Sequence, residues 1–75
     1  MKNLTKCGLN EINEVCDFDP SAPVRERDRL LELGFTQGQK VKIVRLSLAK
    51  NTFLVEIRGY LLSLRRSVAE IVRVK

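Results

Sequence analysis

Apolar side chains recur at every second position through much of the chain after residue 40, and this period constrains the fold more than any other feature of the sequence. The alternation puts apolar groups on one face of an extended segment, whereas a helix needs a period near ~3.6 residues. It runs through the segments 41–48, 53–58 and 60–65, with short turns between them. Several short strands joined by close turns predict a sheet that curls into a small barrel.

The two later segments predict a hairpin with one face in the core. The expected core residues are Phe53, Val55 and Ile57, followed by Tyr60, Leu62 and Leu64. Gly59 between the two segments permits a tight turn. Leu54 and Leu61 fall on the opposite face, so they are candidates for an apolar surface patch.

The alternation slips by one residue in the segment 41–48. Val41 and Ile43 share one phase, whereas Val44, Leu46 and Leu48 share the other. Because a one-residue slip moves every side chain to the opposite face, we expect a β-bulge or a strong bend near 43–44. The residues 49–51 are the expected hairpin loop.

One main helix is expected before these strands, over 24–33. Ser21 is its predicted N-cap and Gly34 its left-handed C-terminal position. Pro23 sits early, where a missing N–H costs little. The expected buried stripe consists of Val24, Leu30, Leu31, Leu33 and Phe35, and the arginines at 25, 27 and 29 lie mostly on the other side.

Two shorter segments complete the expected elements. The spacing of apolar residues in 9–16 suits a strand as well as a helix, so both remain open there. Near the end of the chain, a short helical turn over 66–70 is expected to lead into a last strand over 71–74.

The size and charge of the chain limit its class. Its 75 residues predict a single domain over 1–75, without a secretory signal or an apolar run of the ~20 residues that span a bilayer. The chain has two cysteines, and we expect both to be reduced and Cys16 to be buried. So few cysteines, together with the lack of a signal or a spanning segment, indicate a cytoplasmic protein. The net charge of +5 favours acidic partners, whether protein, lipid or nucleic acid.

The residue types argue against an enzyme. The chain has no histidine, the commonest general base and transition-metal ligand. Its four glycines, at 8, 34, 38 and 59, are isolated and form no phosphate-binding loop. We therefore expect no catalytic residue and no required cofactor, and a function that depends on binding.

Metal binding stays an alternative on a few side chains. Cys7, Cys16 and Asp17, with Asp19 nearby, are weak candidate ligands for Fe2+ or another divalent metal. The cysteines lack the spacing of a CxxC pair, so a purely structural role is favoured for them.

Nucleic-acid binding is ranked lowest. The cations include Arg25, Arg27, Arg29, Lys40, Lys42, Lys50, Arg65 and Arg66. Proteins that bind single strands combine such cations with exposed aromatic rings. Here Phe53 and Tyr60 fall on the expected core faces, so the charged helix is interpreted mainly as a solvated surface.

Four runs of the sequence, taken in order, resemble the ferrous-iron transport protein A (FeoA) family. They are 29–38 at the end of the expected helix, 40–44 at the start of the strands, 55–66 across the hairpin, and 69–74 at the end. The resemblance implies a mostly β fold with one main helix. More closely, it implies a small SH3-like β-barrel of about five to six short strands with a helix inserted after the first strand.

The resemblance also implies a function. It is that of a small cytoplasmic accessory or regulatory protein of bacterial ferrous-iron uptake, which binds the FeoB-type permease and its cytoplasmic G-domain. Such a partner implies recruitment to the inner face of the cell membrane without insertion. A similar domain occurs at the C-terminus of some metal-dependent repressors.

The candidate partner-binding residues combine the exposed leucines with the nearest arginines: Arg25, Arg29, Leu54, Leu61 and Arg65. A divalent-metal sensor or carrier is the alternative function. A homo-oligomer is left open.

Overall fold

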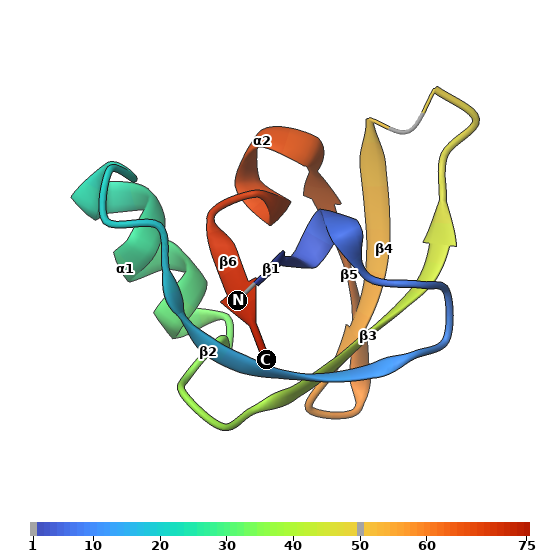
Figure 1. The fold of residues 1–75 in the computed structure, drawn as a ribbon, viewed down its shortest axis with the longest axis horizontal. Coiled ribbons are helices and arrows are strands. Elements are labelled where there is room, and N and C mark those ends of the chain that lie inside the picture. Colours follow the sequence, from blue (N-terminus) through green and yellow to red (C-terminus); the bar gives the residue numbers. More distant parts are fainter. Residues whose placement is uncertain (1, 50) are drawn as a thin grey trace.

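The computed structural model describes residues 2–49 and 51–75 (Figure 1). Its elements, in chain order, are β1 (Lys2–Asn3), the 3-10 helix η1 (Leu4–Lys6), β2 (Ile12–Phe18), α1 (Val24–Glu32), β3 (Lys40–Leu46), β4 (Thr52–Ile57), β5 (Tyr60–Arg65), α2 (Arg66–Ala69) and β6 (Val72–Val74). The expected loop over 49–51 connects β3 to β4, although its Lys50 lies outside the described residues.

These strands form one antiparallel sheet in the order β1-β6-β2-β3-β4-β5. The sheet curls around a common interior, with α1 along one side and α2 at one end (Figure 1). Six short strands and one main helix confirm the predicted SH3-like fold class. The helix follows the second strand, β2, and not the first as expected, because the two-residue β1 precedes β2.

Two irregularities bend the long strands. In β3 the register with β4 shifts between Ile43 and Arg45, which confirms the bulge expected from the slip near 43–44. In β2 the register with β6 shifts between Val15 and Asp17. A bulge increases the local twist, and this lets β2 pair with β3 along one part and with β6 along another.

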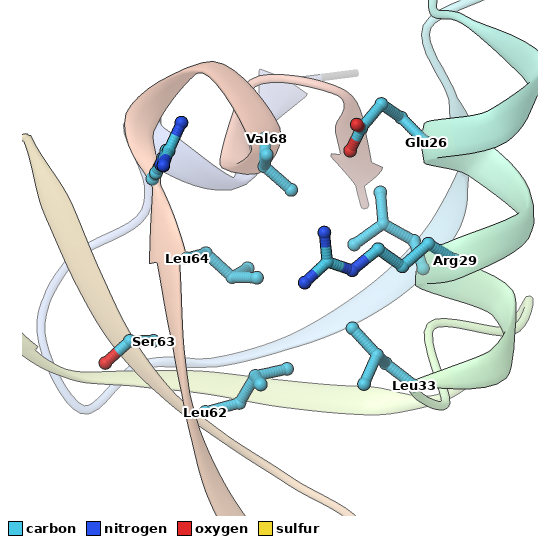
Figure 2. Close-up of a pocket in the computed structure, with 9 residues that line it drawn as sticks. Glu26, Arg29, Leu33, Leu62, Ser63, Leu64 and Val68 are labelled. Atoms are coloured by element: carbon cyan, nitrogen blue, oxygen red, sulfur yellow. The ribbon is translucent and has the colours of Figure 1, made fainter.

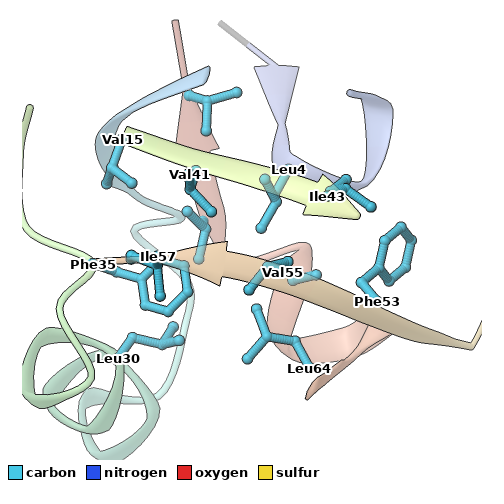
Figure 3. Packing of buried hydrophobic residues seen from close by; sticks show 13 residues of the cluster. Leu4, Val15, Leu30, Phe35, Val41, Ile43, Phe53, Val55, Ile57 and Leu64 are labelled. Atoms are coloured by element: carbon cyan, nitrogen blue, oxygen red, sulfur yellow. The ribbon is translucent and has the colours of Figure 1, made fainter. Parts of the chain in front are cut away.

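The interior is filled by side chains from almost every element (Figure 3). Its buried apolar members are Leu4, Val15, Leu30, Phe35, Val41, Ile43, Phe53, Val55, Ile57, Leu64, Ala69, Val72 and Val74. The prediction for 53–57 is confirmed, because all three expected core residues of β4 are buried. In β5 it is right only for Leu64, since Leu62 is half-buried and Tyr60 is 42% exposed.

The predicted buried stripe of the helix is wrong in two places. Val24 is 61% exposed and Leu31 is 45% exposed, and Leu30 is the one buried residue of α1. Around the helix, Leu31 lies about 100° and Val24 about 120° from Leu30, and a short helix that meets a barrel along one line cannot bury so wide a stripe.

The start of α1 also differs from the prediction. Pro23, not Ser21, occupies the N-cap position, and no side chain caps the helix there. The Ser21 hydroxyl and amide both donate to Oδ1 of Asp19, at 2.7 and 2.9 Å. Ser21 therefore closes a turn before the helix, which starts two residues later than a Ser21 cap would require.

The open prediction for 9–16 is settled as a strand that starts at Ile12. Its inward positions are Asn13 and Val15, and the side-chain Nδ2 of Asn13 donates to the Glu11 carbonyl at 3.0 Å. Cys16 is half-buried rather than buried. At the other end of the chain, α2 and β6 confirm the expected helical turn and last strand. Among the described helices, none has the length and apolar content needed to span a membrane.

Candidate functional site

A groove of about 190 Å³ lies between α1 and β5 (Figure 2). Its floor is apolar and consists of Leu30, Leu33, Leu62, Leu64 and Val68. Its remaining lining is polar or charged and consists of Glu26, Arg29, Ser63 and Arg65. In Figure 2, Leu62 and Leu64 point from β5 towards α1, and Val68 descends from α2. The groove therefore joins an apolar base to a charged border, an arrangement typical of binding sites.

Two arginines on this border carry no ion pair with any residue in 2–49 or 51–75. One is Arg29, whose guanidinium extends from α1 over the floor in Figure 2. The other is Arg65, at the junction of β5 and α2. Glu26 is the acidic residue of the same border, so the charges of the groove sum to positive. An unpaired guanidinium above apolar carbon favours a carboxylate as ligand, because charge-assisted hydrogen bonds strengthen where water is excluded.

The C-terminus of α1 is held by the β4–β5 hairpin, which fixes one end of the groove. The Tyr60 hydroxyl donates a hydrogen bond to the Leu33 carbonyl. Gly34 follows with a φ of 109°, and the Phe35 amide donates back to the Leu30 carbonyl at 3.0 Å. Phe35 is then buried in the core. The helix is thus attached mainly through its last turn.

The predicted partner-binding residues do not form one surface. Arg29 and Arg65 line the groove, whereas Leu54 and Leu61 lie on the outer face of the sheet. Arg25 is exposed on α1 and lies outside the groove lining. Arg29 and the two leucines therefore lie on separate candidate surfaces. Arg65 stands between these surfaces, because it lines the groove from the strand edge while strand alternation puts its side chain on the same face of β5 as Leu61.

The outer face is only partly apolar. Leu61 is 58% exposed, but Leu54 is half-buried. Leu61 stands opposite Glu56, and Glu56 pairs with Lys42 of β3 at 3.5 Å. Ile12 lies beyond Lys42 in the same cross-strand row and is 66% exposed. The ion pair between Lys42 and Glu56 therefore separates these two exposed apolar residues.

The structure does not gather the candidate metal ligands. In the part of the chain it describes, no three Cys, Asp or Glu residues come together. Asp17 instead pairs with Arg73 through two hydrogen bonds, Nε to Oδ1 at 2.6 Å and Nη2 to Oδ2 at 2.8 Å. Burial raises the pKa of the Cys7 thiol and outweighs the positive charge of Lys2, which lowers this pKa. The negative charge of Glu11 makes a smaller contribution that also raises it. A thiol that holds its proton is a poor metal ligand, since the thiolate is the form that binds.

The aromatic side chains offer little to a nucleic acid. Phe35 and Phe53 are buried, and Phe18 packs half-buried against the core. Arg66 stacks on the Phe53 ring, with its guanidinium carbon 5.5 Å from the ring centre. Tyr60 keeps part of its ring exposed, but its hydroxyl is bonded to α1. Base stacking therefore has one exposed aromatic residue, Tyr60, and the half-buried Phe18 available among the described residues.

Sequence reasoning missed the floor of the groove. The apolar periodicity predicts Leu33 and Leu62 as core residues. Both pack partly buried against the core, and both also line the groove. Periodicity assigns a side chain to a face but does not show where a neighbouring element stops covering that face. Glu26 also belongs to the groove, and its helical spacing of three from Arg29 was the one available indication.

The comparisons with known proteins agree with this fold. The family model described as FeoA domain matches residues 2–75. The FeoA protein from Chlorobium tepidum is 30% identical, with a TM-score of 0.85 over 96% of this chain and 67% of that one. No curated protein matches the sequence.

Two further solved structures extend the likeness. The FeoA of Stenotrophomonas maltophilia, solved with zinc and described as a prokaryotic SH3-domain protein and a candidate activating factor of ferrous-iron transport, is 28% identical. Its TM-score is 0.87, over 100% of this chain and 91% of that one. A manganese-dependent transcriptional repressor shares the fold at 15% identity and a TM-score of 0.86, over 99% of this chain and 35% of the repressor. Because the FeoA model covers residues 2–75, the chain belongs to the FeoA family, which is associated with ferrous-iron transport.

Proposed function

We propose that this protein is a cytoplasmic accessory of bacterial ferrous-iron uptake that binds the cytoplasmic region of a FeoB-type permease. The observation that carries the proposal is the FeoA-domain match over residues 2–75. The description of the Stenotrophomonas maltophilia relative as a candidate activating factor supports the same role. On this proposal the protein catalyses no reaction and acts by binding alone, at the inner face of the membrane where its partner holds it.

The α1–β5 groove is the better of the two candidate surfaces for this partner. It offers a concave apolar floor together with Arg29 and Arg65, which form no ion pair within the described ranges, whereas Leu54 and Leu61 lie on the outer face of the sheet, where an ion pair interrupts the apolar residues. Contacts in a concave, partly desolvated site contribute more to binding than isolated exposed leucines do. Arg25 remains a candidate contact on the exposed surface of α1, outside the groove lining.

Two double variants distinguish these surfaces in a calorimetric titration with the cytoplasmic domain of the permease encoded in the same genome. We expect Arg29→Glu with Arg65→Glu to weaken binding at least about tenfold, by repelling an acidic partner group. We expect Leu54→Asp with Leu61→Asp to change it less than threefold. Lys40→Glu with Arg45→Glu is the control for net charge, since both residues are exposed and lie outside the groove.

The unmodified protein must bind in this titration, and circular dichroism must show that each variant is folded. A folded wild-type protein that gives no heat and no co-elution with the permease domain contradicts the proposed function. Binding that is lost only in the leucine variant moves the contact to the outer face and keeps the function.

Divalent-metal binding is the second candidate, favoured by the zinc found in the Stenotrophomonas maltophilia relative. In this chain Cys7, Cys16 and Asp17 are the residues to test, although the described part brings no three ligands together. Anaerobic equilibrium dialysis against Fe2+ and Zn2+ measures the stoichiometry. A value near one that falls on Cys7→Ser with Cys16→Ser supports a carrier or sensor, and an unchanged value dismisses these ligands.

A further inference from the structure

The strand β5 is an edge of the sheet, because it hydrogen-bonds to β4 and ends the strand order. The two-residue turn Arg58-Gly59 closes the hairpin at the pair Ile57–Tyr60. In such a hairpin the closing pair exchanges its hydrogen bonds, and the pairs alternate from there. The backbones of Leu62 and Leu64 therefore face β4, whereas those of Leu61, Ser63 and Arg65 face away from it.

The outward backbone groups of β5 have no partner among residues 2–49 and 51–75. No hydrogen bond joins the amide of Leu61, Ser63 or Arg65, or the carbonyl of Leu61 or Ser63, to another described group. The carbonyl of Arg65 lies at the N-cap of α2 and belongs to the start of that helix. A row of free donors and acceptors on an apolar strand is a template for a further strand, and proteins commonly cover or interrupt such edges. This edge contains no proline, and its inward side chains after Tyr60 are Leu62 and Leu64.

The groove runs along this same edge. It is lined by four consecutive residues of β5, from Leu62 to Arg65. Because successive side chains of a strand point to opposite faces, a single surface can touch all four only along the edge of the strand. The opposite wall is α1, with Glu26, Arg29, Leu30 and Leu33 (Figure 2). The free backbone edge, the apolar floor and the unpaired arginines thus belong to one site.

We propose that the groove binds an extended segment of a partner protein as an additional strand on β5. The segment hydrogen-bonds to the backbone of Leu61, Ser63 and Arg65 and places alternate apolar side chains on the leucine floor. One acidic side chain of the segment pairs with Arg29 or Arg65. This mode of recognition takes its affinity from main-chain hydrogen bonds and its specificity from pockets for alternate side chains. The inference rests on the proposed function, since it assigns the permease segment its binding mode.

A second copy of this chain fits the site less well than a single segment. The β5 of a second copy is backed by its own β4, at a strand spacing of about 4.8 Å. Two adjacent strands would have to enter between β5 and α1, and the helix stands in that space. A lone extended segment needs room for one strand only. The charge of the site also favours an acidic segment over this chain, whose net charge is +5.

The test uses isotopically labelled full-length protein and overlapping peptides that cover the cytoplasmic segments of the permease of the same genome. We expect one peptide to slow hydrogen exchange at the amides of Leu61, Ser63 and Arg65 at least about tenfold, with little change at Leu62 and Leu64, which are already bonded to β4. Ser63→Pro removes one outward donor and leaves the β4 ladder intact, because edge strands tolerate proline there. We expect Ser63→Pro to weaken binding of the peptide at least about tenfold, whereas the matched control Ser63→Ala should bind the peptide as tightly as the wild type.

The outcomes separate the inference from the function on which it rests. If the permease domain binds but the three outward amides stay unprotected, the strand-addition mode is wrong and the accessory function survives. If neither domain nor peptide binds, both are wrong. Concentration-dependent protection of the same amides without any peptide, together with a dimeric mass in light scattering, identifies a second copy as the occupant and overturns the commitment to a partner segment. Should Ser63→Pro fail to fold, the exchange experiment on the wild-type protein decides alone.

Discussion

Gly34 ends α1 with a φ of 109°, and a Cβ at this position would stand 2.6 Å from Cδ of Arg58. We therefore expect Gly34→Ala to destabilise the protein by more than the ~1–2 kcal/mol that a side chain costs in a left-handed conformation. Urea denaturation measures the free energy of unfolding.

Gly38 supplies the matched control. Its φ of 87° is also left-handed, but a Cβ there meets no atom within 4 Å. Gly38→Ala should lose only the conformational contribution. Equal losses in the two variants would mean that Arg58 moves aside without cost and that its contact with Gly34 contributes nothing.

The carboxyl of Asp17 has a pKa below its usual value, chiefly because the Arg73 side chain donates hydrogen bonds to it. A carboxyl whose pKa is lower in the folded state stabilises the fold above its unfolded pKa, near ~3.9, and loses this contribution as the pH falls through the folded pKa. We expect Asp17→Asn to be less stable than the wild type at pH 7 and equally stable once the pH lies below the folded pKa. Thermal unfolding between pH 2 and pH 7 measures the difference.

Asp28→Asn is the control for this experiment, because Asp28 is exposed on α1 and forms no ion pair within the described ranges. Its stability should follow that of the wild type at every pH. A gap between Asp17→Asn and the wild type that stays constant down to pH 2 would assign the loss to packing instead of charge.

Residue-level features were the least predictable from the sequence. Asp17 and Arg73 are 56 positions apart, so their pairing depends on β2 lying beside β6. Ser21 is a residue type that commonly caps helices, but its hydroxyl donates to the nearby carboxylate of Asp19 instead. In both cases the pairing depends on which of several acceptors lies closest in the folded protein, and local sequence propensity does not contain that information.

At the scale of elements, the β4–β5 hairpin has a residue that does not suit its turn. Arg58 takes a φ of 52° and Gly59 a φ of 83°, the combination for which Asn-Gly is the preferred pair. We expect Arg58→Asn to raise the free energy of unfolding by about 0.5–1 kcal/mol, because asparagine tolerates the left-handed conformation better. Arg58→Ala removes the same side chain without that advantage and should not stabilise. Chemical denaturation of both variants gives the comparison, and a gain in the alanine variant alone would contradict the explanation.

Strands were predicted better than the helix packing. The alternation over 53–57 and the slip near 43–44 report directly which face each residue occupies, since the period of a strand fixes its faces. The stripe of α1 was overestimated, because Val24 and Leu31 are as apolar as Leu30 and nothing local limits how much of a helix a barrel can cover. Burial of a helix face depends on its crossing geometry, which the sequence does not encode at short range.

At the scale of the whole molecule, the candidate site is a gap between elements that are distant in the chain. Arg29 and Arg65 were named from the sequence, but their common groove arises only where α1 stops short of covering β5. The fold was predictable from periodicity and family resemblance. The groove was not, because it depends on the surface that the packing leaves uncovered.

The attachment of α1 leads to a last prediction. The helix buries Leu30 alone within its own length and is fixed mainly at its C-terminal turn by Tyr60 and Phe35. Elements with few buried apolar contacts open locally without global unfolding. We expect the amides of α1 to exchange with solvent at least about tenfold faster than those of Val55 and Ile57 in β4, and with little dependence on urea. Equal protection in both elements would show that helix and barrel unfold as one unit.

Because α1 is one wall of the groove, local opening of the helix would widen the site for an entering strand. A bound segment that bridges α1 and β5 should then slow exchange in the helix as well as along the β5 edge.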